Sequence, residues 1–177
     1  GPSTTTYDFD AFGNRTEMVV GAATTTYDYD DADRLTEVTP PSPASALSYT
    51  WDDNGDLTAR GSDSFSWDYE DRMVSATVSS VTTSFVYRGD GLRESRVVSG
   101  GATTQFTWDI AGGLPALLDD GSYRFVWGLG VTSHISGTGA THYYLADGLG
   151  STMGLVDSTG ALVASLRYDV YGEVTAG

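Results

Sequence analysis

A short aromatic motif recurs along the chain and constrains its fold more than any other feature. Two aromatic residues stand one residue apart, an acidic residue follows them in five of six copies, and glycine or aspartate comes three residues later. The motif restarts every 16 to 22 residues. A repeat of this length predicts an array of small, similar structural units rather than one irregular domain.

The spacing of the aromatic residues predicts a β-strand in each copy. Side chains at positions i and i+2 of a strand project from the same face. The residue between them is polar in five of the six copies, so the other face is expected to meet solvent. The residues that we expect to pack on the common face are Tyr7, Phe9, Tyr27, Tyr29, Tyr49, Trp51, Phe65, Trp67, Phe85, Tyr87, Phe106 and Trp108.

The residues that follow each aromatic pair predict a tight turn. Aspartate at the first position of a type I turn accepts backbone N–H bonds, and glycine at the fourth position takes a positive φ. A second strand then returns, for example over residues 15–20, so each copy is predicted to form a β-hairpin. The expected turn residues are Asp10, Gly13, Asp30, Asp52, Gly55, Asp68, Asp109 and Gly112.

Isolated hairpins cannot bury an aromatic face, so consecutive hairpins are expected to pair edge to edge. The predicted fold is therefore all-β: tandem hairpins in an antiparallel sheet that strand twist coils into a spiral or an open barrel. The 22 glycines and the abundance of aromatic residues agree with this fold class. A compact domain of this length would bury roughly 70% of its unfolded surface.

The repeated motif resembles the YD repeat of Rhs proteins, of teneurins and of the cocoon subunits of insecticidal toxin complexes. The best matches are residues 7–15, with the sequence YDFDAFGNR, and residues 51–57, with the sequence WDDNGDL. The C-terminal stretch is similar to the Rhs core segment, and residues 123–130 resemble the strand pair before that core. The residues that carry the core resemblance are Tyr143, Tyr144, Asp147, Gly150, Asp157, Gly160, Tyr168, Asp169 and Gly172.

This resemblance implies a domain organisation and a function. Residues 1–3 are interpreted as the remnant of an expression tag, 4–130 as YD-repeat hairpins, and 131–177 as core-like hairpins that continue the same sheet. In the family, the repeats form a spiralling shell, which encloses a C-terminal toxin in bacterial members and belongs to adhesion receptors in animals. The resemblance thus implies a secreted or cell-surface bacterial scaffold, a partial YD-repeat shell with a C-terminal effector as its intramolecular partner.

The family's junction motif, which follows the core, does not occur before Gly177. We therefore expect an incomplete turn of the spiral, with exposed sheet edges that favour self-association. An alternative remains open, because rows of tyrosine and tryptophan can also stack on sugars or peptides. On this reading the chain is an adhesion module that binds carbohydrate or a partner protein through the aromatic face or a sheet edge.

The charge and composition disfavour several classes of partner. With 24 acidic against 9 basic residues, the net charge is −15, which opposes binding to nucleic acid and to anionic membranes. The sequence lacks an apolar run of about 18 residues, so no transmembrane helix is predicted. It also lacks cysteine, which rules out disulfides and thiolate metal sites.

The remaining candidates for chemistry are acidic clusters and two histidines. Clustered aspartates could bind calcium or form a carboxylate pair for glycoside hydrolysis, but an aspartate that recurs at every turn fits a turn role better. His134 and His142 are eight residues apart and match no metal-binding spacing, and His142 is expected on a strand face. A nucleophile elbow and a phosphate-binding loop are missing. We therefore predict no catalytic residue, no metal site and no cofactor.

Overall fold

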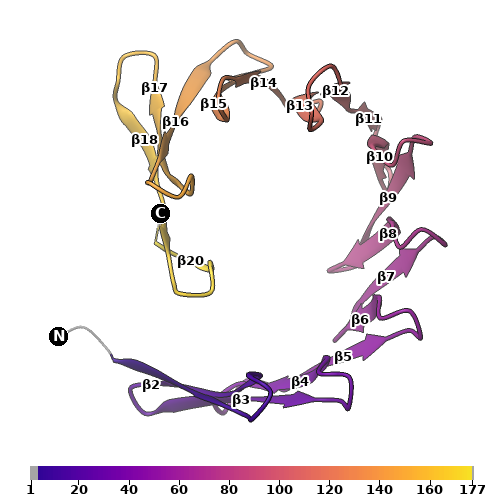
Figure 1. Cartoon of the computed structure of the whole chain (residues 1–177), viewed down its shortest axis with the longest axis vertical. Coiled ribbons are helices and arrows are strands. Elements are labelled where there is room, and N and C mark those ends of the chain that lie inside the picture. Colours follow the sequence, from indigo (N-terminus) through magenta and orange to yellow (C-terminus); the bar gives the residue numbers. More distant parts are fainter. Residues whose placement is uncertain (1–3, 177) are drawn as a thin grey trace. The chain divides into compact units, whose positions relative to one another are not determined.

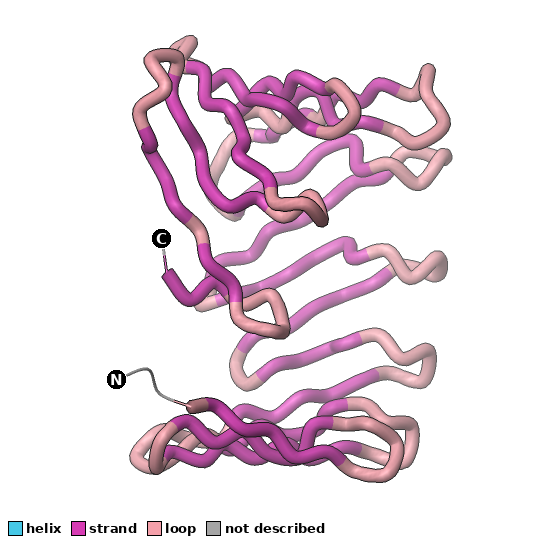
Figure 2. The backbone as a smooth tube through the Cα atoms, turned by 60° about the vertical axis from the view of Figure 1, so that its left-hand side comes forward, coloured by secondary structure: helices cyan, strands magenta, loops and turns pink. Residues whose placement is uncertain are grey.

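The computed structural model describes residues 4–176, and its regular structure consists of β-strands joined by turns, with no helix in that range (Figure 1, Figure 2). The proposed tag remnant, residues 1–3, lies outside the described residues, as does residue 177. The strands are β1 (Thr5–Phe9), β2 (Arg15–Val20), β3 (Ala23–Tyr29), β4 (Leu35–Thr39), β5 (Leu47–Trp51), β6 (Leu57–Arg60), β7 (Asp63–Trp67), β8 (Met73–Val78), β9 (Val81–Tyr87), β10 (Arg93–Val98), β11 (Thr103–Gln105), β12 (Thr107–Asp109), β13 (Ala116–Asp119), β14 (Tyr123–Trp127), β15 (Val131–Ser136), β16 (Thr141–Ala146), β17 (Thr152–Asp157), β18 (Leu162–Ser165), β19 (Arg167–Tyr168) and β20 (Val174–Ala176).

Each strand pairs with the strand that precedes or follows it in the sequence. The strand order within the sheets is β1 to β11, β12 to β18, and β19 with β20. The pairings are antiparallel, as in β1 with β2 and β16 with β17. The predicted fold class, tandem hairpins in antiparallel sheets of the kind found in a YD-repeat shell, is confirmed.

By its contacts the chain divides into two compact units. The first comprises the residues up to Phe85 together with Val98–Gly101, and the second comprises Val86–Val97 together with the residues from Ala102 onward. Within each unit, the pairs of strands with substantial contact are neighbours in the sequence. The stability of such an array comes from nearest-neighbour interfaces, as in other repeat proteins.

Backbone hydrogen bonds continue at the two places where one sheet ends and the next begins. The Phe106 amide, between β11 and β12, donates to the carbonyl of Glu94 at 2.9 Å, and the Leu166 amide, between β18 and β19, donates to Met153 at 2.8 Å. The sheets thus change at these two residues. The proposed domain boundary after residue 130 falls instead between β14 and β15, which pair with one another, and that division of the chain stays a prediction.

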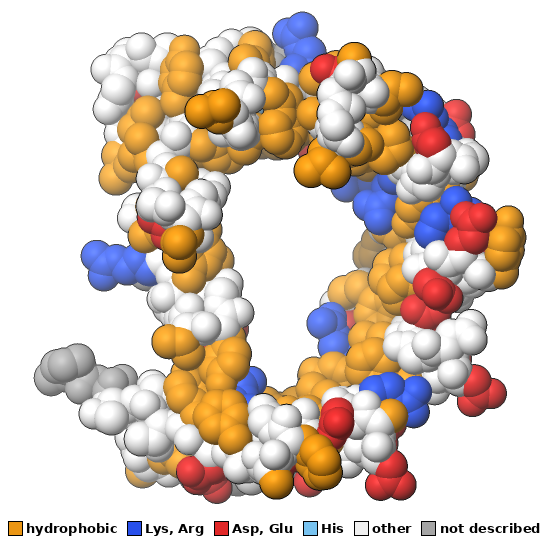
Figure 3. All heavy atoms as spheres, in the orientation of Figure 1, with side chains coloured by type: hydrophobic (Ala, Val, Ile, Leu, Met, Phe, Trp, Pro, Cys, Tyr) orange, Lys and Arg blue, Asp and Glu red, His pale blue; other side chains and the backbone are white. Residues whose placement is uncertain are grey.

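The chain has little interior. Over residues 4–175, Tyr27 is the only buried apolar side chain, at 9% exposure, and none is fully buried. The accessible surface is 11574 Å², against about 8,300 Å² for a compact protein of this mass and about 27,000 Å² for the unfolded chain. Burial is therefore roughly 57%, less than the 70% of a compact domain of this length, because sheets with half-covered faces replace two packed layers. Figure 3 shows hydrophobic side chains gathered along one face of the hairpins of the first unit.

Candidate functional site: the aromatic face and the hairpin turns

The predicted aromatic residues lie on one face of their strands. Eleven of the twelve are buried or half-buried, whereas Phe9 is 53% exposed. The residue between each pair is exposed in all six strands, including the apolar Val86. This alternation is what a sheet with one covered and one solvated face produces.

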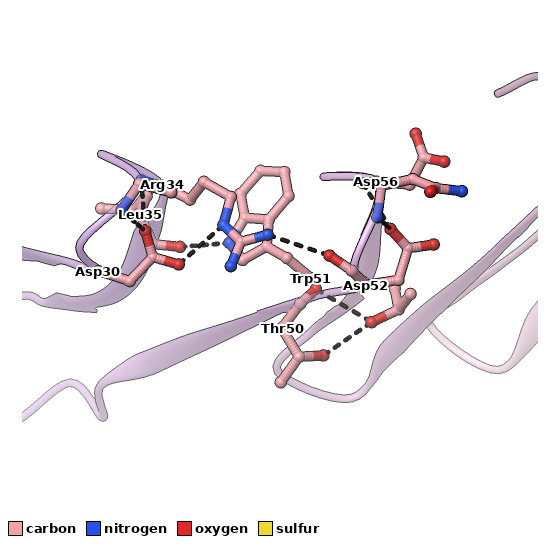
Figure 4. Close-up of polar contacts among 10 residues, drawn as sticks. Asp30, Arg34, Leu35, Thr50, Trp51, Asp52 and Asp56 are labelled. Atoms are coloured by element: carbon pink, nitrogen blue, oxygen red, sulfur yellow. Dashed lines mark hydrogen bonds and ion pairs between the residues drawn. The ribbon is translucent and has the colours of Figure 1, made fainter.

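A hydrogen bond from a ring to the backbone recurs between successive hairpins. A tyrosine or tryptophan near the end of one strand donates to a carbonyl at the start of an earlier return strand. In Figure 4 the indole of Trp51 reaches Leu35 in this way. The six bonds are Tyr29 Oη to Arg15 O (3.0 Å), Trp51 Nε1 to Leu35 O (2.8 Å), Trp67 Nε1 to Leu57 O (2.8 Å), Trp108 Nε1 to Arg93 O (2.8 Å), Trp127 Nε1 to Leu117 O (2.7 Å) and Tyr168 Oη to Thr152 O (2.6 Å).

We call this set the ring-to-carbonyl ladder. It accounts for the preference for tryptophan and tyrosine at the second aromatic position, because phenylalanine has no polar hydrogen to donate. The ladder also reaches two residues outside the six predicted repeats, Trp127 and Tyr168. The acceptor residues of the ladder cannot be recognised from the sequence, because any residue supplies a backbone carbonyl.

Nine hairpin turns within residues 4–176 share one geometry. In each, the first residue's amide donates to the carbonyl four residues on, and its carbonyl accepts from the amide three residues on. The fourth residue has a positive φ, and in seven of the turns it is glycine. The first residues of the nine turns are Asp10, Asp30, Asp52, Asp68, Arg88, Ser136, Asp147, Asp157 and Asp169.

The geometry is a type I turn followed by a bulge. The strand register shifts by one residue beside the turn, for example between Asp8 and Phe9, as expected where the fourth residue is left-handed. Seven of the nine first residues are aspartates whose Oδ1 accepts two backbone amides, as Asp147 does from Leu149 and Ser151, both at 2.9 Å. The amides of Ser151 and Leu149 lower the pKa of Asp147.

Two predicted turn residues are placed differently. Asp109 accepts the amide of Ala111 at 2.9 Å, but its strand partner is Ala116, so residues 110–115 form a longer loop. Gly112 lies inside that loop and has no positive φ. In two tight turns, aspartate takes the fourth, left-handed position, as Asp33 (φ 60°) and Asp71 (φ 57°).

Neighbouring turns in the first unit contact one another through polar groups. The Asn14 side-chain amide donates to Asp33 at 2.7 Å, and the Arg34 guanidinium donates to the carbonyl of Asp52 at 3.0 Å (Figure 4). Arg34 also pairs with Asp30 at 2.8 Å. The backbone amide of Arg34 is the main group that lowers the pKa of Asp30.

Three of the nine turns lie in the C-terminal segment that resembles the Rhs core. Asp147, Asp157 and Asp169 each start a tight turn, and Gly150, Gly160 and Gly172 take its left-handed position, with φ between 84° and 89°. The Tyr168 hydroxyl belongs to the ladder. Tyr143 is 46% exposed, whereas Tyr144 turns to the opposite face of β16, where it meets a histidine.

The structure places the two histidines in contact, although no contact between them was predicted from the sequence. His134 in β15 and His142 in β16 are register partners, and their facing nitrogens are 3.1 Å apart. His134 is 7% exposed, and burial lowers its pKa. The turn Ser136–Gly139 could have revealed the pair, because this turn geometry places residues 135 and 141, and then 134 and 142, opposite one another.

The hollows of the surface offer little chemistry. One of about 400 Å³ is lined by turn aspartates such as Asp10 and Asp30, whose oxygens bond their own turns. Another, of about 640 Å³, is lined by Leu149, Met153 and Tyr168. In the described part of the chain no group of three or more histidines or carboxylates is arranged to hold a metal ion, and no helix is long and apolar enough to cross a membrane.

Comparison with known proteins reveals similarity at the level of structure. No protein-family model matches the sequence, and no curated protein matches it. Among solved structures, the Tc holotoxin pore of Photorhabdus luminescens has a TM-score of 0.56 and 12% identity, over 97% of this chain and 15% of that one. TcdB2-TccC3-TEV has a TM-score of 0.54 and 12% identity, over 98% of this chain and 16% of that one.

A third structure, TcdB2-TccC3 without its hypervariable C-terminal region, gives a TM-score of 0.51 at 12% identity, over 97% of this chain and 16% of that one. The chain thus spans about a sixth of the length of the chains that it matches. At this identity the likeness defines the fold alone. It agrees with the Rhs and YD-repeat resemblance of the motifs, and the chain has the fold of a segment of the Tc toxin chains.

Proposed function

We propose that this chain is a structural segment of a secreted bacterial Rhs-type shell wall, with no catalytic role of its own. In the longer protein, the wall would enclose or present a C-terminal effector. The observation that carries this proposal is the ring-to-carbonyl ladder. It joins successive hairpins through bonds that any number of repeats can extend. One face of the six repeat strands carries aromatic rings, all of which except Phe9 are buried or half-buried.

Three further observations support a scaffold role. Seven of the aspartates are engaged in the same way in the hydrogen bonds of tight turns. Turn aspartates line two of the surface hollows, Asp10 and Asp30 in one and Asp147 and Asp169 in the other, and each of these four accepts backbone amides of its own turn. The matching solved structures are Tc toxin chains, and one of them is TcdB2-TccC3 without its hypervariable C-terminal region, which fits a wall segment beside a variable effector.

Limited proteolysis of the parent protein tests the proposal. We expect the region C-terminal to this segment to resist protease in the intact protein, because a wall excludes the protease. The double substitution Trp51→Ala and Trp67→Ala removes two hydrogen bonds of the ladder. The region C-terminal to this segment should then be cleaved at least several-fold faster. Tyr69→Ala, at a turn residue that is 87% exposed, is the matched control and should leave protection unchanged.

Equal cleavage of the C-terminal region in the intact protein and in the double variant would contradict the proposal. Binding of the isolated 177-residue chain to a glycan array, lost on replacement of Trp108 or Phe106, would favour the adhesion alternative instead. Those two rings line a hollow of about 330 Å³ together with Tyr87 and Arg93.

A further inference from the structure

Both ring nitrogens of His134 are engaged in a cluster on β14, β15 and β16. Nδ1 lies 3.0 Å from the hydroxyl of Tyr144, and Nε2 lies 3.1 Å from Nδ1 of His142. The Tyr123 ring packs edge-on against His134, with ring centroids 4.6 Å apart. His134 is one of four buried polar residues over residues 4–175. Its imidazole is therefore held by specific bonds where water has little access.

The number of protons in this cluster is restricted. Two neutral imidazoles facing one another form a single N–H···N bond. When His134 is the donor, its Nδ1 accepts the hydroxyl hydrogen of Tyr144, and when His142 is the donor, Nδ1 of His134 donates to Tyr144. One extra proton fits without loss of a bond, because one N–H remains between the two rings while Nδ1 of His134 donates to Tyr144. A second extra proton places N–H groups on both sides of the 3.1 Å gap between two cationic rings.

The surrounding charges do not relieve that conflict. Asp120, just before β14, raises the pKa of His134, but this effect is smaller than those of burial and of His142, which lower it. Asp157 in β17 is the register partner of His142 and interacts electrostatically with it. Tyr123 and Tyr144 carry no charge near neutral pH. The charge of Asp120 therefore offsets only part of the effects of burial and of His142 that disfavour a cation at His134.

We propose that His134, His142 and Tyr144 form a proton-operated switch that holds β15 to β16 near neutral pH and releases this pairing on mild acidification. The hairpin β15–β16 would open because its cross-strand histidine contact becomes repulsive. The switch would act in this way whether or not the chain belongs to a shell wall.

The direction of the pH dependence follows from linkage. The folded-state pKa of His134 lies below the ordinary value of about 6.5, so the unfolded chain binds more protons than the folded chain as the pH falls. The stabilising contribution is fully present above pH about 6.5 and is lost as the pH falls toward the folded-state pKa. Each proton taken up on unfolding changes the folding equilibrium constant about tenfold per pH unit.

Nuclear magnetic resonance of the 177-residue chain tests the switch directly, because His134 and His142 are its only histidines. Imidazole ¹⁵N and ¹³C shifts between pH 8 and 4.5 should show His134 titrating below a free histidine. The loss of native amide signals from β15 and β16 should accompany the second protonation, ahead of signals from β1 to β4. Titration of His134 like free histidine, with β15 and β16 amides unchanged to pH 4.5, would overturn the proposal.

Variants separate the switch from a purely structural role. His142→Gln removes the second cation but can still hydrogen bond, so the loss of β15–β16 amide signals should move to lower pH. Tyr143→Phe, on the opposite face of β16, is the matched control and should keep the wild-type profile. If His142→Gln does not fold, Tyr144→Phe provides a second test, because without the acceptor oxygen the loss of signals should move to higher pH. An unchanged profile in whichever variant folds would overturn the proposal.

Discussion

The indole N–H of Trp67 donates a 2.8 Å hydrogen bond to the carbonyl of Leu57, the residue at which the return strand of the preceding hairpin begins. Consecutive hairpins are thereby joined by a side chain as well as by strand pairing. The bond fixes the position of the indole relative to the preceding hairpin. A tryptophan at this position of the repeat therefore helps to set the register between two consecutive hairpins.

Replacing Trp67 by phenylalanine should destabilise the first unit. The change leaves the Leu57 carbonyl without this donor, which costs about 0.5–1.5 kcal/mol, and the smaller ring adds a packing loss. Urea unfolding followed by tryptophan fluorescence would measure it. Tyr69→Phe, at an 87% exposed turn residue, should change the free energy of unfolding by less than about 0.5 kcal/mol. Equal midpoints for the two variants would refute the ladder's contribution.

The turn after β16 allows the same substitution to be tested at two glycines, Gly148 and Gly150, that are separated by one residue. Gly150 has φ +89°, whereas Gly148 lies outside the left-handed region, and an added Cβ would meet no atom within 4 Å at either one. Gly150→Ala should therefore destabilise by about 1–2 kcal/mol through backbone strain alone. Gly148→Ala should stabilise by about 0.4–1 kcal/mol, because alanine restricts the unfolded chain. Thermal unfolding of both variants measures the difference, and shifts of the same sign would contradict it.

Local residue patterns predict much of this fold. The aromatic pairs and turn aspartates of the repeat predict strand faces and turns, because both features depend on residues close together in the sequence. Asp30 and Asp52, for example, need only the amides two and four residues ahead to form their turns. A hairpin's register follows from its turn, so even the pairing of His134 with His142 is implicit in residues 136–140.

Other features depend on which hairpins meet, and the pattern does not encode them. One sheet ends and the next begins at Phe106 because β11 and β12 pair with different neighbouring strands. The long loop after Asp109 replaces a predicted tight turn, although the sequence there has the aspartate and glycine of the motif. The extent to which each ring is buried is not encoded either, because composition cannot distinguish a half-covered sheet from two packed layers.

The turn between β8 and β9 stores backbone strain. Ser79 and Ser80 both have positive φ, 50° and 67°, which is the geometry of a two-residue type I′ hairpin turn that favours Asn-Gly. Replacing Ser79 by asparagine and Ser80 by glycine should stabilise the chain by about 1 kcal/mol or more. The bond from the Ser79 amide to Asp63 is kept, because the donor is backbone.

Ser62→Gly is the control for that turn. Ser62 occupies the two-residue turn between β6 and β7 without a positive φ, so glycine there brings only added freedom to the unfolded chain and should be neutral or destabilising. Differential scanning calorimetry would compare the melting temperatures. A melting temperature of the double variant at or below that of the wild type would show that the serines are not strained.

Acid should strengthen one contact between turns in the first unit. The Asp56 carboxyl faces that of Asp71, and its Oδ2 is buried without a hydrogen-bond donor. Burial raises the pKa of Asp56, and the nearby charges of Asp71 and Asp52 raise it further. Because the folded-state pKa lies above the unfolded value, this contribution is fully present below the unfolded pKa and is lost as the pH rises through the folded one. Its sign is opposite to that of the histidine cluster.

Asp56→Asn isolates this contact, because the amide can donate to Asp71 without taking up a proton. The variant should have a higher urea midpoint than the wild type at pH 7, and the two midpoints should converge as the pH falls toward 4. Asp53→Asn, an exposed neighbour in the same turn, removes the same charge without the facing carboxyl and should give a smaller, less pH-dependent change. A midpoint difference between Asp56→Asn and wild type that stays constant from pH 7 to 4 would show that Asp56 and Asp71 share no proton.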